Sequence, residues 1–301
     1  MAENKEQRIV GKRRGNVFGF WFFRIIARFL GLRVAYSFLY LICLHYVLFD
    51  RQATNGALAY IKRRFPGKNF FVARLHVFRL FVSQGKQLID RYAAISGNAV
   101  LDVKRLGKEQ LAELLRQRKE GLILLTAHVG NWQIALTVLK DLNRKVHVVM
   151  RPEDNPAVEG SLNISRQDDF IRVISPEKAL DSVIQIMHAI KEGDIVAVMG
   201  DRKYSADALA VDFLGDKAFF PYGGFLIAAA AGCPVVVVLT SRLGYKKYLV
   251  NVHNVFNPRY QNASRKQEEL RGFVQEFAVV LEKYTQEYPY QFFLFSDIWK
   301  K

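Results

Sequence analysis

A chain of 301 residues, 50% hydrophobic and 24% charged, can bury one large core or a core domain with an appendage. This composition excludes a disordered or fibrous protein, and the two cysteines, Cys43 and Cys233, show neither disulfide nor metal-ligand spacing. Most of the net charge of +16 falls within residues 1–91, which contain 17 Lys and Arg but only 4 Asp and Glu. The same segment is rich in large apolar side chains. Basic and apolar side chains in one segment favour a membrane surface over nucleic acid, so we expect no nucleic-acid partner.

Residues 1–16 are polar and lack the small-residue cleavage site of a signal peptide, so we expect them to be retained. The next residues are aromatic and apolar, interrupted by Arg24, Arg28 and Arg33. These three arginines are four or five residues apart and can share one helical face, which is the pattern of a helix lying in a membrane interface.

The stretch 34–49 carries no formal charge. It is just short of the roughly 17–25 residues that span a bilayer, unless the helix begins at Leu30. Both flanks are basic, so the spanning and the interfacial alternatives stay open. Residues 67–95 predict another amphipathic helix, packed on the main domain or touching the membrane. We therefore expect residues 1–97 to form a helical membrane-associating region.

From residue 98 onwards, short β-rich runs alternate with helical stretches. The expected strands are 121–127, 145–150, 171–175, 194–200, 233–240 and 248–252. The expected helices lie near 131–142, 155–168, 176–191, 223–231 and 262–285. Continuous Val, Ile and Leu runs separated by helices are typical of a sheet covered on both faces. Residues 98–301 are thus expected to form an α/β domain with a mixed or mostly parallel central sheet, although the pattern leaves the strand order open.

The most informative stretch is TAHVGNWQIA, residues 126–135, which follows a buried strand and opens a helix. Gly130 permits a tight turn there, and Asn131 can cap the helix. His128 falls in the loop that commonly lines the ligand crevice of an open α/β sheet, with Gln133 close enough to hydrogen-bond its ring. Such a histidine can act as a general base that lets a hydroxyl attack a thioester carbonyl; the alternative is a surface or packing role. A surface or packing role is expected for the other histidines, which are His45, His76, His147, His188 and His253.

The block AHVGNWQ resembles the His-x4-acidic motif of the lysophospholipid and lipid A acyltransferase superfamily, in its lauroyl/myristoyl branch. GNVFGFWFFRIIARFLG is similar to that branch's N-terminal membrane helix region. Further blocks follow in the family's order: VVMRPEDNP (148–156), VAVMGDR (196–202), VDFLGDKAFFPYGGFLIAAAAGCPVVVV (211–238) and YPYQFFLFSDIW (288–299). The resemblance covers nearly the whole chain, and the blocks in register are far more specific than any one alone.

The resemblance implies an O-acyltransferase on the cytosolic face of a bacterial inner membrane, with His128 as the base. It implies acyl-ACP or acyl-CoA as co-substrate, no tightly bound cofactor, no metal, and a membrane lipid or glycolipid such as a lipid A precursor as acceptor. Arg151 would contact anionic groups of acceptor or donor, or else pack at a strand end. Asp201 and Arg202 would lie at the crevice, or else form a mutual surface ion pair. The remaining expected substrate-binding residues, which include shapers of the acyl or acceptor pocket, are Asn131, Phe220, Pro221 and Gly223.

Gln133 departs from the family pattern, which has Asp or Glu at this position. A carboxylate there would fix the imidazole tautomer and stabilise the imidazolium, whereas an amide can orient the ring but offers no charge. Three possibilities follow: Gln133 supports slower chemistry, another carboxylate such as Asp201 substitutes, or the protein is a catalytically silent lipid-binding homologue.

Overall fold

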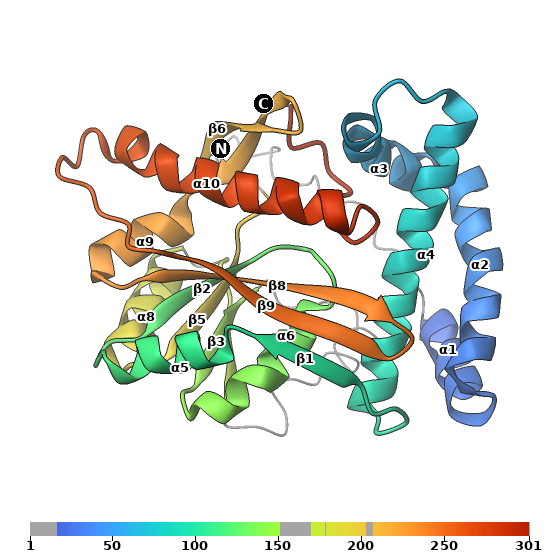
Figure 1. Ribbon diagram of the computed structural model, residues 1–301, viewed down its shortest axis with the longest axis horizontal. Coiled ribbons are helices and arrows are strands. Elements are labelled where there is room, and N and C mark those ends of the chain that lie inside the picture. Colours follow the sequence, from blue (N-terminus) through green and yellow to red (C-terminus); the bar gives the residue numbers. More distant parts are fainter. Residues whose placement is uncertain (1–16, 151–169, 178, 203–206, 301) are drawn as a thin grey trace, which may run out of the picture.

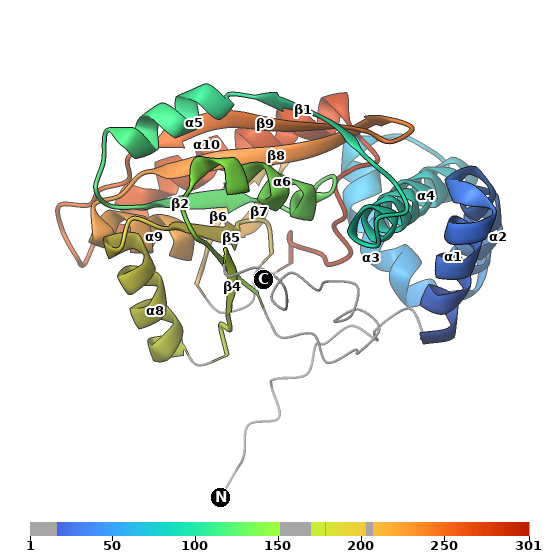
Figure 2. The ribbon, with the colours of Figure 1, turned by 90° about the horizontal axis from the view of Figure 1, so that it is seen from below.

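The computed structural model describes residues 17–150, 170–177, 179–202 and 207–300. Its first part consists of four helices, grouped at one end of the molecule in Figures 1 and 2: α1 (Val17–Phe29), α2 (Gly31–Phe49), α3 (Arg51–Arg64) and α4 (Phe70–Ile95). Side-chain caps start two of them, because the Asp50 carboxylate accepts the N–H of Ala53 and the Asn69 amide oxygen accepts the N–H of Val72. The helices expected within 34–49 and 67–95 are therefore present as α2 and α4.

Helix α2 keeps much of its apolar surface outside the core. It is long and apolar enough to cross a membrane by length and composition, and only 33% of its most apolar window is buried. The large apolar residues that it leaves exposed are Val34, Phe38, Tyr40, Leu41, Leu44, Leu48 and Phe49. Such a contiguous apolar face on a folded protein marks an interaction surface rather than ordinary exposure.

The rest of the chain forms a seven-stranded sheet in the order β1-β9-β8-β2-β5-β3-β4. Its strands are β1 (Asp102–Leu106), β2 (Leu122–Thr126), β3 (Val146–Val149), β4 (Ile171–Ile174), β5 (Ile195–Met199), β8 (Val235–Gly244) and β9 (Lys247–Phe256). Every neighbouring pair is parallel except the hairpin β8–β9. The expected α/β class with a mostly parallel sheet flanked by helices is confirmed.

Successive side chains along each strand point to opposite faces of the sheet, so the core has two layers. In β2, Leu122 and Leu124 face helices α5 (Lys108–Arg116) and α6 (Trp132–Leu139), the latter continued by the short 3-10 helix η1 (Lys140–Leu142). Ile123 and Leu125 face the opposite layer. That layer is built by α8 (Ala179–Lys191), α9 (Gly223–Ala231), α10 (Lys266–Glu287) and the two-stranded antiparallel sheet of β6 (Ala208–Phe213) and β7 (Asp216–Pro221). Burial on both faces explains why β2 is a continuous apolar run.

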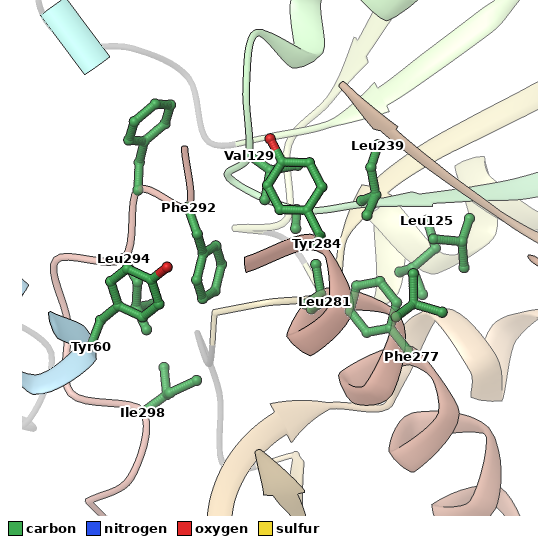
Figure 3. Packing of buried hydrophobic residues seen from close by; sticks show 14 of the residues in the cluster. Tyr60, Leu125, Val129, Leu239, Phe277, Leu281, Tyr284, Phe292, Leu294 and Ile298 are labelled. Atoms are coloured by element: carbon green, nitrogen blue, oxygen red, sulfur yellow. The ribbon is translucent and has the colours of Figure 1, made fainter. Parts of the chain in front are cut away.

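The helical part and the sheet share buried contacts. Phe292, after α10, reaches into the buried cluster that also holds Val129 and Tyr60 of α3, with the Tyr60 and Phe292 ring centroids 5.3 Å apart (Figure 3). The division into domains at residues 1–97 and 98–301 stays a prediction. The helix expected near 155–168 lies outside the described residues.

A buried polar cluster also joins the two parts. The carboxylate of Asp90 in α4 is fully buried and accepts hydrogen bonds from Arg242 Nε at 2.9 Å, from the Tyr248 hydroxyl at 2.6 Å and from the Tyr36 hydroxyl. Burial and the neighbouring Asp90 carboxylate raise the pKa of Tyr248. Because each donor comes from a different element, this cluster fixes α2 and α4 against the β8–β9 hairpin.

Candidate active site

The pairing of β2 with β5 brings two functional candidates together. The strands run parallel, with Thr126 opposite Met199, so the chain leaves both strands at the same edge of the sheet. His128 and Asp201 each lie two residues beyond these matched positions. Nδ1 of His128 lies 2.9 Å from Oδ1 and 3.1 Å from Oδ2 of Asp201. The strand register therefore creates a histidine–carboxylate pair at the carboxyl edge, where open α/β sheets bind ligands.

The C-terminal segment holds the backbone of the His128 loop. The N–H of Phe293 donates to the carbonyl of His128 at 2.8 Å, and the N–H of Gly130 donates to the carbonyl of Gln291 at 3.0 Å. These bonds enclose an antiparallel bridge between Val129 and Phe292. In the sequence, the 288–299 block stands out only through the family resemblance. No local pattern predicts that this segment hydrogen-bonds to the His128 loop.

Gly130 is required by the geometry of this loop. Its φ is +51°, in the left-handed region that favours glycine. A Cβ at this position would lie 2.0 Å from the carbonyl oxygen of Thr240. That oxygen belongs to a strand of the sheet and cannot move aside, so a side chain here would displace the loop that carries His128.

Burial and charge set the protonation of the pair. Burial lowers the pKa of His128; Arg202 lowers it further, while the charge and hydrogen bond of Asp201 oppose this. Burial raises the pKa of Asp201, but His128 and Arg202 outweigh it, so the pKa of this carboxyl lies below its usual range. An ionised Asp201 accepts the hydrogen bond, so Nδ1 of His128 carries the proton and Nε2 is left unprotonated. The His128 side chain is 20% exposed and the Asp201 side chain is fully buried, so the unprotonated nitrogen belongs to the partner that keeps some contact with solvent.

Gln133 does not orient the imidazole ring of His128. It lies half-buried in the first turn of α6, and no hydrogen bond in the described part of the chain joins it to His128. Asn131 is buried just before α6, where its carbonyl accepts the N–H of Ile134. Its side-chain amide donates to the carbonyl of Gln87 in α4 at 3.1 Å. Asn131 thus ties the His128 loop to the helical part.

Arg202 supplies a positive charge beside the pair. Its Nη2 donates to the carbonyl of Phe293 at 2.6 Å, while its Nε is buried without a hydrogen-bond partner among the described residues. The mutual surface ion pair considered for Asp201 and Arg202 does not occur, since Asp201 is buried against His128. Arg151, the other expected anion-binding residue, lies outside the described residues.

The three remaining candidates lie in β7 and at the start of α9. Phe220 is fully buried, with its ring 5.3 Å from that of Phe213 and 6.2 Å from that of Phe277, centroid to centroid. Pro221 ends β7, and Gly223 begins α9. No hydrogen bond or ring contact within the described ranges joins any of them to His128. Their part in an acyl or acceptor pocket stays a prediction.

A neutral histidine held through Nδ1 by an ionised carboxylate is the arrangement of a general base. The free Nε2 can accept a proton from a hydroxyl, and the buried carboxylate stabilises the imidazolium that forms. Across the described ranges, no group of three or more His, Cys, Asp or Glu side chains could hold a metal ion. The chemistry that these residues can perform themselves is proton transfer.

Three comparisons with known proteins bear on the family of this chain. No curated protein matches the sequence. Among solved structures the chain is similar to the 1-acyl-sn-glycerophosphate (LPA) acyltransferase PlsC from Thermotoga maritima, with 16% identity, a TM-score of 0.39, and coverage of 86% of this chain and 97% of that one. The family profile described as bacterial lipid A biosynthesis acyltransferase matches residues 89–301, a segment that contains both His128 and Asp201. The chain therefore belongs to the family of bacterial lipid A biosynthesis acyltransferases.

Proposed function

We propose that the protein transfers a fatty acyl group from acyl-ACP or acyl-CoA to a hydroxyl of a membrane lipid or glycolipid, such as a lipid A precursor, with His128 as the general base. The observation that carries this proposal is the hydrogen-bonded pair of His128 and the buried Asp201 at the carboxyl edge of the sheet. It supports the possibility that Asp201, rather than Gln133, supplies the carboxylate that this chain lacks at the usual motif position.

In the proposed reaction, Nε2 of His128 removes the proton of the acceptor hydroxyl while its oxygen attacks the thioester carbonyl carbon. The C–O bond forms and the carbonyl electrons move to oxygen, giving a tetrahedral intermediate. Asp201 stabilises the imidazolium of His128 in this state. Collapse of the intermediate breaks the C–S bond, and the leaving thiolate takes the proton from Nε2 as a free thiol. The products are an ester and the thiol of the carrier, and His128 is again neutral.

The acceptor in this proposal comes from the cytosolic leaflet of the inner membrane. Support comes from the exposed apolar face of α2 and from the basic residues at its two ends, such as Arg33 in its first turn and Arg51 just after it. Arg202, fixed beside the pair by Phe293, is proposed to attract an anionic group of donor or acceptor. Arg151 is proposed for the same task, and Asn131, Phe220, Pro221 and Gly223 to support or shape the substrate pocket.

A specific observation also favours a second candidate, a catalytically silent lipid-binding homologue: Gln133 replaces the acidic residue of the motif. The two functions are distinguished with the purified full chain, lipid vesicles containing the candidate acceptor, and acyl-ACP or acyl-CoA labelled in the acyl chain. The acyltransferase transfers label from at least one donor to the lipid fraction. Vesicle binding without transfer from either donor would refute the enzymatic proposal and support the silent homologue.

Profiling of the host's lipids with and without the gene then identifies the product. An acyl chain missing from one lipid class in the deletion strain, and restored by the gene, names the acceptor. An unchanged lipid profile would contradict a biosynthetic role in that membrane.

A further inference from the structure

A cavity of about 570 Å³ lies between the helical part and the end of α10. Its walls come from α2, α4, β8 and residues 287–291, and Figure 1 shows α10 ending on the side of the molecule where α4 stands. Its lining includes neither His128 nor Asp201. The cavity is therefore distinct from the histidine–carboxylate pair, and its polar lining residues are Tyr40, Arg79, Lys86, Arg242, Glu287 and Tyr290.

Among the residues that the structure describes, two of the three cations lining this cavity have no acidic partner. Arg242 is committed to Asp90, as described above. Arg79 and Lys86, by contrast, make no ion pair within the part of the chain that the structure describes. They are seven residues apart on α4, two helical turns, and so point from the same face of the helix. Glu287 is the single acid among the described lining residues, and it interacts with the hydroxyl of Tyr288.

Tyrosine side chains hold both cations in place. Nζ of Lys86 donates to the Tyr40 hydroxyl at 2.7 Å and lies 4.8 Å from the centroid of the Tyr40 ring. Nη1 of Arg79 donates to the Tyr290 hydroxyl at 3.3 Å. These contacts use neutral acceptors and leave further N–H donors on both cations, which a phosphate with several oxygens can satisfy.

The rim of the cavity continues into the exposed apolar surface of the helices. Tyr40 and Leu75 line the cavity and are also 43% and 47% exposed. Next to them on the same helices lie other exposed apolar residues, among them Leu41 and Leu44 on α2 and Phe71 on α4. A lipid could therefore keep its acyl chains along this apolar surface while its headgroup reaches the two cations.

We infer that this cavity binds the anionic phosphate headgroup of a membrane phospholipid, at a site separate from the one where His128 acts. The phosphate oxygens accept hydrogen bonds from Arg79 and Lys86, and the acyl chains follow the apolar rim at Tyr40 and Leu75. This inference goes beyond the proposed acyl transfer, because the bound lipid is not acylated and its binding does not depend on the histidine–carboxylate pair.

The test is a calorimetric titration of the full chain, in neutral detergent, with dihexanoyl phosphatidylglycerol, dihexanoyl phosphatidylcholine and inorganic phosphate. Tighter binding of phosphatidylglycerol than of the other two probes is expected, because it alone combines a net negative headgroup with acyl chains. Arg79→Ala combined with Lys86→Ala should weaken that binding by at least about tenfold, since charge-assisted hydrogen bonds are lost. The matched control, Lys119→Ala with Lys191→Ala, removes the same charge from exposed positions and should bind as the wild type does.

Three results would overturn the inference: unchanged affinity in the Arg79/Lys86 variant, an equal loss in the control variant, or inorganic phosphate binding as tightly as phosphatidylglycerol. The last would identify a site for free anions instead of lipid. Should the alanine variant unfold in a thermal melt, Arg79→Gln with Lys86→Gln keeps the side-chain stems and is judged by the same criteria.

Discussion

Replacing Asp201 by asparagine removes the charge beside His128 while nearly preserving the side-chain volume. In the wild type, both carboxylate oxygens lie within 3.1 Å of Nδ1, so the ring is held with its proton on that nitrogen. An asparagine amide can present its N–H₂ group instead, which favours the tautomer that protonates Nε2 and so blocks the base. The side chain is fully buried, and water cannot compensate for the lost charge.

The expected loss is large. In Ser-His-Asp sites the equivalent change lowers kcat by about 10⁴, which corresponds to about 5 kcal/mol of transition-state stabilisation. For Asp201→Asn we expect a decrease of about 10² to 10⁴ in kcat, because a charge-bearing hydrogen bond and the correct tautomer are lost together. The acid limb of the pH–rate profile should also move to lower pH, since Asp201 raises the pKa of His128.

The assay measures initial rates of label transfer from an acyl thioester to lipid across a pH series, with thermal unfolding as a check on folding. Asp212→Asn is the matched control, because Asp212 is an exposed carboxylate on β6. Activity of Asp201→Asn within about threefold of the wild type, in a folded protein, would refute the role given to the carboxylate.

Three further predictions concern the His128 loop and the first turn of α6 that follows it. Because burial lowers the pKa of His128, kcat/KM should stay constant as pH falls past the usual histidine value of about 6.5 and decrease only below it; a decrease beginning above that value would contradict this. Gln133→Glu should change kcat by less than about tenfold, since Asp201 already holds Nδ1; a gain of orders of magnitude would show that the native site lacks its carboxylate. Gly130→Ala should lower the free energy of unfolding by about 2–4 kcal/mol in urea titrations, because its Cβ would meet the carbonyl of Thr240; unchanged stability would refute the steric argument.

The sequence indicated the strands that are buried on both faces, because β2, β5 and β8 are continuous apolar runs. It did not reveal β1, whose residues DVKRL are mostly charged and exposed at the sheet edge. Nor did it reveal the hairpin of β6 and β7, which packs on α10 outside the main sheet. Edge strands and small hairpins have weak patterns since only part of their surface is buried.

The site was predictable to the extent that its chemistry is local. His128 could be identified from the strand–glycine–helix pattern around it, and Asp201 as a carboxylate at the end of another strand. The sequence could not choose between Gln133 and Asp201 as the partner of the ring, because that choice depends on β2 and β5 being neighbours in register. The backbone hydrogen bonds that Gln291 and Phe293 make to the His128 loop could not be predicted either, because they join residues more than 160 positions apart.

The most direct test of the central claim is the rate of acyl transfer by His128→Ala in the full chain, compared with the wild type and with His188→Ala. His188 is an exposed histidine at the end of α8, so its replacement controls for the chemical change itself. If Nε2 of His128 is the base, the first variant should fold and lose transfer by about 10³-fold or more, while the control keeps wild-type rates. A folded His128→Ala protein that still transfers acyl groups at the wild-type rate would contradict the account.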